Sequence, residues 1–190
     1  MPRVLHTEHL MLRPGTLADL DAVQSLWNEP AVRRFLFDDR ALSRQEARDF
    51  LAASDESFAQ QGYGLWLFFE RPLLERSGEA MVKDRPLTTA PSGQSLTLAG
   101  FSGLIPVPDG PPSLVFATQP QLWGRGYARE AAAAVLRYVF DDLGLEQVVA
   151  DVDEPNTASI HVLERLWMVQ TGRAMVNDRP LLYYALRPAK

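Results

Sequence analysis

The residues with the clearest potential for chemistry lie in one short run, residues 116–128. The run begins with apolar residues, as a strand would, and then places Gly124 and Gly126 before an alanine-rich stretch. The first amide groups of a helix have no partner within the helix, and the helix dipole adds positive potential there. Glycines let successive amide groups converge on phosphate oxygens. With Arg125 and Arg129 beside the turn, the run predicts an anion-binding site.

The glycine turn alone does not identify a ligand. Residue 129 is arginine, so the glycines do not complete the fingerprint of a dinucleotide-binding turn. No Gly-Lys-Ser/Thr follows them, as a P-loop would require. From these residues alone, a helix start that binds nothing is an equally good interpretation.

The composition excludes several other kinds of chemistry. The 190 residues include no cysteine and three histidines, which excludes disulfides, thiolate metal sites and a cysteine nucleophile and argues against a zinc site. A net charge of -5 argues against a protein that binds nucleic acid. The sequence has neither the run of about 20 apolar residues that a membrane span needs nor a secretory signal. We therefore expect a cytoplasmic protein that binds no metal, nucleic acid or membrane.

The spacing of apolar and turn-forming residues predicts the elements that must hold the turn in place. Helices are expected at residues 16–28, 43–60, 124–143 and 156–166, the first two with capping boxes. Strands are expected at residues 10–13, 65–69, 96–107, 114–118, 147–152, 169–175 and 181–186. We interpret residues 1–190 as one domain, in which residues 70–94 form an irregular, mobile excursion between two strands.

Residues 121–126 resemble the Q/R-x-x-G-x-G/A signature of the GNAT superfamily of acyl-CoA-dependent N-acyltransferases. Residues 7–14, 27–32, 120–128 and 156–166 are similar, in the same order, to motifs of its ribosomal-protein N-acetyltransferase branch. Several motifs in order are more specific than any one of them. The resemblance implies a mixed α/β (α+β) GNAT-like fold, whose mostly antiparallel sheet of about seven strands is splayed in the middle and flanked by about four helices.

The resemblance also implies that acetyl-CoA is the co-substrate. Strands 114–118 and 147–152 would separate, and the pantetheine arm of coenzyme A would lie along the backbone like an added strand. Residues expected to contact coenzyme A are Phe116, Ala117, Thr118, Gln121, Trp123, Gly124, Arg125, Gly126, Tyr127, Ala128, Asn156 and Ser159. Asn156 would bond the pantetheine arm or a structural water, and Ser159 would protonate the leaving thiolate. Both residues could instead simply cap the helix at 156–166.

The expected reaction is direct attack of an amine on the thioester, without an enzyme nucleophile. A carboxylate would take the proton of the amine, and a strand amide near Ala117 would stabilise the developing oxyanion. The general base is unassigned, because Ser113 stands near the place where the branch commonly has glutamate. Asp151, Asp153 and Glu154 are the candidates for this role.

Four further positions depart from the family pattern. Leu163 stands where other branches carry a tyrosine general acid, and His161 replaces a common arginine, which would weaken a phosphate contact. Trp167-Met168 replaces the usual Gly-Phe after the helix. Because a left-handed tryptophan would cost roughly 1–2 kcal/mol, we expect the exit of this helix, and with it the acceptor pocket, to differ from the family.

These features lead us to expect an N-acetyltransferase that acts on a protein N-terminus or a small-molecule amine. Succinyl or another acyl donor is an open variant, and a catalytically weak module that binds or senses acyl-CoA is the alternative function. The incomplete dinucleotide fingerprint speaks against a third class, a nucleotide-dependent enzyme on a doubly wound sheet. Homodimers are common among proteins of this type, but the sequence shows no interface patch.

Overall fold

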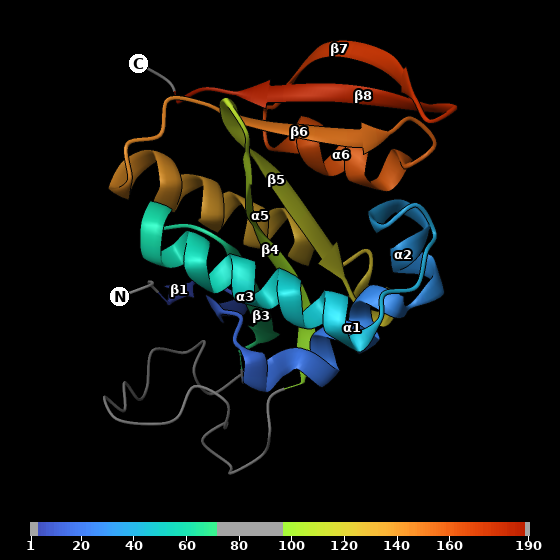
Figure 1. The fold of residues 1–190 in the computed structure, drawn as a ribbon. Coiled ribbons are helices and arrows are strands. Elements are labelled where there is room, and N and C mark those ends of the chain that lie inside the picture. Colours follow the sequence, from blue (N-terminus) through green and yellow to red (C-terminus); the bar gives the residue numbers. More distant parts are fainter. Residues whose placement is uncertain (1–3, 72–96, 189–190) are drawn as a thin grey trace.

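Eight strands form one sheet in the computed structural model, which describes residues 4–71 and 97–188 (Figure 1). The strands are β1 (Leu5–His6), β2 (Leu10–Pro14), β3 (Leu65–Glu70), β4 (Leu98–Val107), β5 (Gly110–Thr118), β6 (Val148–Asp153), β7 (Val169–Val176) and β8 (Arg179–Leu186). Their order is β1-β2-β3-β4-β5-β6-β8-β7. Every neighbouring pair is antiparallel except β5 and β6, which run parallel. The expected mixed α/β class with a mostly antiparallel sheet is therefore confirmed.

Five α-helices accompany the sheet in the described residues. They are α1 (Leu20–Asn28), α2 (Pro30–Leu36), α3 (Arg44–Gln61), α5 (Tyr127–Arg137) and α6 (Thr157–Arg165). Shorter helical turns are η1 (Leu17–Asp19), η2 (Pro120–Leu122) and the π-helical η3 (Tyr138–Asp142). No helix in the described ranges combines the length and the apolar character that crossing a bilayer requires.

Within residues 4–71 and 97–188, the structure has one strand and one helix more than the sequence predicted. β1 is only two residues long, too short for its alternation to be recognised. α2 begins at Pro30 directly after α1, where proline suggested only the end of the preceding helix. Proline is well suited to the first turn of a helix because the amide it lacks has no partner there. The irregular excursion expected at residues 70–94 lies outside the described residues, apart from Glu70 and Arg71.

Both predicted capping boxes are present. The Ser43 hydroxyl accepts a hydrogen bond from the Glu46 amide, and the Glu46 carboxylate accepts one from the Ser43 amide at 2.8 Å. The equivalent box of Thr16 and Asp19 begins η1, which leads into α1. These boxes mark helix starts in the sequence because both partners lie within one turn.

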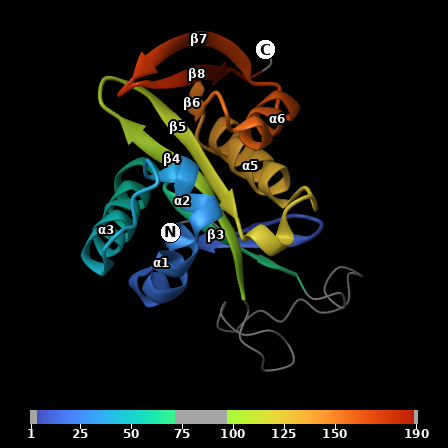
Figure 2. The same cartoon turned by 90° about the vertical axis from the view of Figure 1, so that its right-hand side faces the viewer.

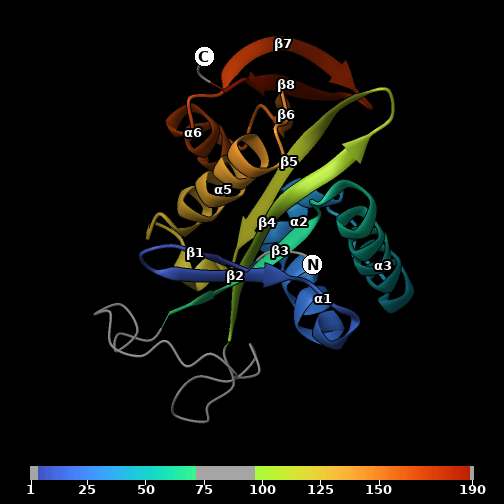
Figure 3. The ribbon, with the colours of Figure 1, turned by 90° about the vertical axis from the view of Figure 1, so that its left-hand side faces the viewer.

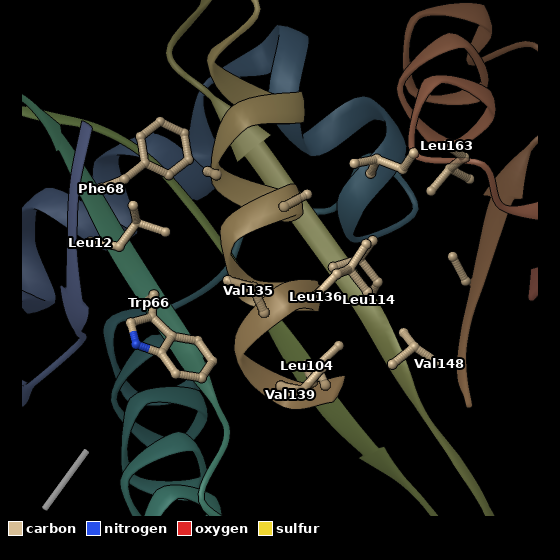
Figure 4. Packing of buried hydrophobic residues seen from close by; sticks show 14 of the residues in the cluster. Leu12, Trp66, Phe68, Leu104, Leu114, Val135, Leu136, Val139, Val148 and Leu163 are labelled. Atoms are coloured by element: carbon tan, nitrogen blue, oxygen red, sulfur yellow. The ribbon is translucent and has the colours of Figure 1, made fainter. Parts of the chain in front are cut away.

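The helices pack on both faces of the sheet and form two hydrophobic cores. α5 and α6 lie on one face, while α1, α2 and α3 lie on the other (Figures 2 and 3). In the first core, Val135 and Leu136 of α5 and Val139 of η3 pack with Leu104 of β4 and Val148 of β6 (Figure 4). The second core is built around Trp27 of α1, which is almost fully buried.

Helix α5 begins later than predicted, and its continuation to the predicted end is the π-helical η3. The alanine-rich pattern suggested a helix over 124–143, but Gly124 and Gly126 have φ values of 78° and 81°, which a right-handed helix cannot contain. The helix therefore begins at Tyr127, and η3 continues it after Arg137. The two glycines form a turn in front of the helix, as the anion-site hypothesis requires.

Candidate functional site

Strands β5 and β6 separate soon after they meet. The two parallel strands share one register pair, Ser113 with Val149, although β5 runs on to Thr118 and β6 to Asp153. The next neighbour of β6 is β8, which pairs with it along its whole length. The last part of β5 thus has β4 on one side and no strand of the described chain on the other (Figure 2). This is the splayed centre that the sequence led us to expect.

A cavity of about 780 Å³ lies at this separation. Its walls come from α2, β5, the turn before α5, the end of β6 and helix α6. Ten residues expected to contact coenzyme A line it: Phe116, Ala117, Thr118, Trp123, Gly124, Gly126, Tyr127, Ala128, Asn156 and Ser159. The other two, Gln121 and Arg125, lie outside the lining. Two stretches that are separate in the sequence therefore meet around one cavity.

The turn before α5 leaves open space in front of the helix. Apart from atoms of the adjoining residues, no described heavy atom lies within 4 Å of the place that a Cβ would occupy at Gly124 or Gly126. Gly126 is the N-cap of α5, and no side chain caps the helix there. The amides at the start of α5 are consequently available to a ligand, and larger residues would find the positive φ values unfavourable.

Thr118 and Trp123 add a second feature that fits a polar ligand. The Trp123 indole donates a hydrogen bond to the Thr118 carbonyl at 2.8 Å, which ties the turn to the end of β5. The Thr118 hydroxyl is buried and has no hydrogen-bond partner among the described residues, although Thr118 lines the cavity. A buried hydroxyl without a partner costs about 1–3 kcal/mol, so a ligand atom that bonds it would gain affinity.

Arg125 points away from the cavity toward β3. Its Nη1 lies 3.2 Å from Oε1 of Glu70, and the Tyr127 hydroxyl donates to the same oxygen at 2.6 Å. Glu70 therefore fixes the turn and the first residue of α5 to the end of β3. Positive charge at the cavity comes instead from Arg129 and Arg165, which both line it.

Asn156 and Ser159 stand together at the start of α6. The Ser159 amide donates to Asn156 Oδ1 at 3.2 Å, so the capping role of Asn156 is real. Both residues also line the cavity, and the Ser159 hydroxyl forms no hydrogen bond with a described residue. Leu163, in place of a tyrosine, is buried in the first core.

The structure separates the three candidate bases. Glu154 forms an ion pair with Arg173 at 2.8 Å and does not line the cavity, whereas Asp151 and Asp153 do. Burial raises the pKa of the Asp153 carboxyl, and the charges of Asp38 and Asp151 raise it further, although the Arg179 guanidinium opposes them.

The exit of α6 corrects one expectation. Trp167 adopts φ of 62°, so the left-handed turn is made despite the missing glycine. The Trp167 amide donates to Glu164 and the Met168 amide to Leu163, as in a Schellman cap. The Trp167 side chain is 82% exposed and does not line the cavity. The expected change in the helix exit is therefore wrong, whereas the expected difference in the acceptor pocket stays a prediction.

Sequence reasoning did not predict helix α2, which forms one wall of the cavity. Ala31, Val32, Phe35 and Leu36 line the cavity, as does Asp38 just beyond the helix. Their spacing places the four apolar residues on one helix face. In the sequence, only this spacing indicated a helix at these residues. Pro30, at the start of α2, suggested a helix end instead.

Known proteins share this architecture. A family model described as "Acetyltransferase (GNAT) domain" matches residues 9–169. The "Uncharacterized N-acetyltransferase p20" of Bacillus licheniformis is 24% identical over 168 residues, which cover 88% of this chain and 83% of that protein.

Two solved structures show the same fold. The acetyltransferase from Agrobacterium tumefaciens str. C58 has a TM-score of 0.75 at 23% identity, with coverage of 98% of this chain and 95% of its own. The ribosomal alpha-N-protein acetyltransferase RimL, solved in complex with coenzyme A, has a TM-score of 0.72 at 16% identity, with coverage of 97% and 98%.

Proposed function

Because the chain belongs to the GNAT acetyltransferase family, we propose that it transfers the acetyl group of acetyl-CoA to a primary amine. The observation that carries the proposal is the cavity between β5 and β6, bounded by the glycine turn at the start of α5. The order of its sequence motifs favours the ribosomal-protein N-acetyltransferase branch. A protein N-terminus and a small-molecule amine are the two kinds of acceptor that this branch assignment leaves open.

The chain's own groups fit coenzyme A along the length of the cavity. The amides at the start of α5 hold the pyrophosphate, with Arg129 adding positive charge. The unpaired edge of β5 holds the pantetheine arm through backbone hydrogen bonds. The buried Thr118 hydroxyl gains a partner in the same step. When bound, acetyl-CoA supplies an activated acetyl group as a thioester.

Three groups of the chain act on the reaction. Asp153 takes the proton of the amine as its nitrogen bonds to the acetyl carbon, and Arg179 contacts Oδ2 while leaving Oδ1 for this role. A β5 amide near Ala117 stabilises negative charge on the carbonyl oxygen. Ser159 gives its proton to the sulfur as the carbon–sulfur bond breaks, and it regains a proton from solvent as Asp153 releases the one it took. The products are an N-acetylated amine and coenzyme A.

The alternative is a module that binds acyl-CoA and catalyses acyl transfer only weakly. It is favoured by Leu163, which is buried where other branches have a tyrosine acid. It is also favoured by Ser113, which lies outside the cavity lining and carries no carboxylate. Both functions use the same binding site and differ only in the rate of transfer.

Ligand-dependent melting and thiol release test the proposal together. Acetyl-CoA should raise the melting temperature, since a ligand at one hundred times its Kd stabilises the fold by about 2.7 kcal/mol. NAD and ATP should have no effect. Thiol release with a panel of amines should then reveal turnover. A shift with NAD and none with acetyl-CoA would refute the proposal, whereas binding without turnover on any amine would support the sensing module.

A further inference from the structure

The side chains around the cavity differ on the two faces of the sheet. Val148, Ala150 and Val152 of β6 pack into the core formed with α5 and α6. Because side chains alternate along a strand, Asp151 and Asp153 project to the opposite face, toward α2. Both aspartates line the cavity. The face that carries α5 therefore supplies the groups proposed to hold coenzyme A, and the other face remains for the acceptor.

The acceptor face combines an apolar wall with carboxylates. Val32, Phe35 and Leu36 of α2 form the apolar wall. Asp151 and Asp153 lie at the end of strand β6, across the cavity from α2. Asp38, which follows α2 in the chain, lines the same cavity. An acceptor here meets apolar surface and negative charge together.

The negative charge is only partly neutralised. Arg179 of β8 pairs through Nη1 with Asp38 and through Nη2 with Asp153. Asp151 forms no ion pair with any residue in ranges 4–71 and 97–188. The Arg179 guanidinium thus pairs with two of the three carboxylates, which leaves an excess of negative charge at the acceptor end.

We propose that the acceptor is a primary amine attached to an apolar, preferably aromatic, group and without a carboxylate beside the amine. This inference rests on the proposed transferase function. The ammonium group is drawn to Asp151 and Asp153, and the apolar group lies on Phe35 and Leu36. A free amino acid carries a carboxylate two bonds from its nitrogen, and that group is repelled by the same aspartates. The amide of that amino acid, or the N-terminus of a peptide, lacks the repelled charge.

A matched acceptor series tests the inference by kcat/KM for thiol release at saturating acetyl-CoA. We expect 2-phenylethylamine to exceed ethanolamine, and phenylalanine amide to exceed phenylalanine, by about tenfold or more each. Phe35→Ala should bring the ratio of kcat/KM for 2-phenylethylamine over ethanolamine toward one. Asp151→Asn should bring the ratio for phenylalanine amide over phenylalanine toward one. Asp55→Asn, which removes an exposed carboxylate of α3 outside the cavity lining, should change neither ratio. An amidated peptide that begins with phenylalanine shows whether a chain terminus or a small amine is preferred.

Calorimetry separates this inference from the proposed function. The titration of 2-phenylethylamine into protein saturated with coenzyme A measures acceptor binding without turnover, and Asp151→Asn should weaken it about tenfold. Product formation with equal rates for phenylalanine and its amide overturns the inference and leaves the transferase function standing. If no amine yields product, the transferase function fails, but the calorimetric comparison still tests the acceptor class. The inference about the acceptor is overturned if 2-phenylethylamine does not bind, or if Asp151→Asn leaves its binding unchanged.

Discussion

Ser113 of β5 and Val149 of β6 face each other in the one register pair that joins these parallel strands. Antiparallel pairing holds β5 to β4 and β6 to β8, so each strand stays in the sheet as the two diverge. If the strands paired to their ends, the amides of β5 would be consumed by β6, and no extended ligand could join the sheet. The short contact between β5 and β6 is thus the condition for the proposed site.

Gly126→Glu should abolish binding of coenzyme A. The substituted side chain would occupy the open space in front of α5 and repel the pyrophosphate that we place there. Calorimetric titration with acetyl-CoA measures the loss. The control is Gly144→Glu, because Gly144 also has positive φ, at 69°, and open space around it but lies outside the cavity lining. Equal affinity of both variants for acetyl-CoA would remove the glycine turn from the site.

Ser159→Ala should lower kcat by about 10²–10⁴-fold with little change in affinity for coenzyme A, because it removes a proton donor and leaves the binding surface intact. Steady-state kinetics and calorimetry on the same preparation measure the two effects. Ser43→Ala is the matched control, since it removes a capping hydroxyl from α3 at a cost of about 1 kcal/mol and should not affect kcat. Full activity of Ser159→Ala would show that another group protonates the sulfur.

The acidic limb of the pH profile should depend on Asp38. Burial raises the pKa of Asp153 above its ordinary 3.8, and the charge of Asp38 contributes to the rise. Since a base must be deprotonated, kcat/KM increases as the pH passes this raised pKa. Asp38→Asn should move the limb to lower pH, and Asp55→Asn should not. The parent and variant profiles are recorded with the same amine, so the titration of the acceptor affects both equally. An acidic limb that Asp38→Asn does not move would argue against Asp153 as the base.

The same raised pKa fixes the sign of a stability effect. Folding favours the protonated carboxyl of Asp153, so its contribution to stability is full below the unfolded-state pKa. The contribution is lost as the pH rises through the folded-state pKa. Melting curves across this range, recorded for the parent protein and Asp38→Asn, should show the loss at lower pH in the variant.

Trp167→Gly should stabilise the protein by about 1 kcal/mol. Trp167 holds a left-handed φ of 62°, which glycine adopts without strain, and its exposed side chain contributes little packing. Denaturant unfolding measures the gain. Trp167→Ala keeps the strain and should show no such increase, so equal stabilities of the two variants would contradict the explanation.

The parts of the fold that sequence predicted well are determined by neighbours in the chain. The box of Ser43 and Glu46 and the cap formed by Asn156 each lie within one helical turn, so the pattern and the structure agree. The start of α5 was predicted too early because Gly124 and Gly126 stand just before the alanine-rich stretch and were included in the helix. The φ values of those glycines, which the apolar spacing does not encode, decided the boundary.

The parts of the site that sequence missed are formed by distant residues. Arg179 and Asp38 are 141 positions apart, and Tyr127 and Glu70 are 57 apart. No local spacing predicts such pairs, because they depend on how β8 approaches α2 and how β3 approaches α5. The glycine turn and Ser159 could be recognised as candidates, whereas the acceptor wall became visible only when the chain was folded.

The bond from the Trp123 indole to the Thr118 carbonyl gives the cavity its own optical reporter. Trp27 and Trp66 are buried in the cores, so Trp123 and Trp167 are the two indoles exposed to solvent. In a Trp167→Gly background, Trp123 alone would respond to an external quencher such as iodide. Its emission could then follow occupancy of the cavity in real time, without a fluorescent label or a coupled assay.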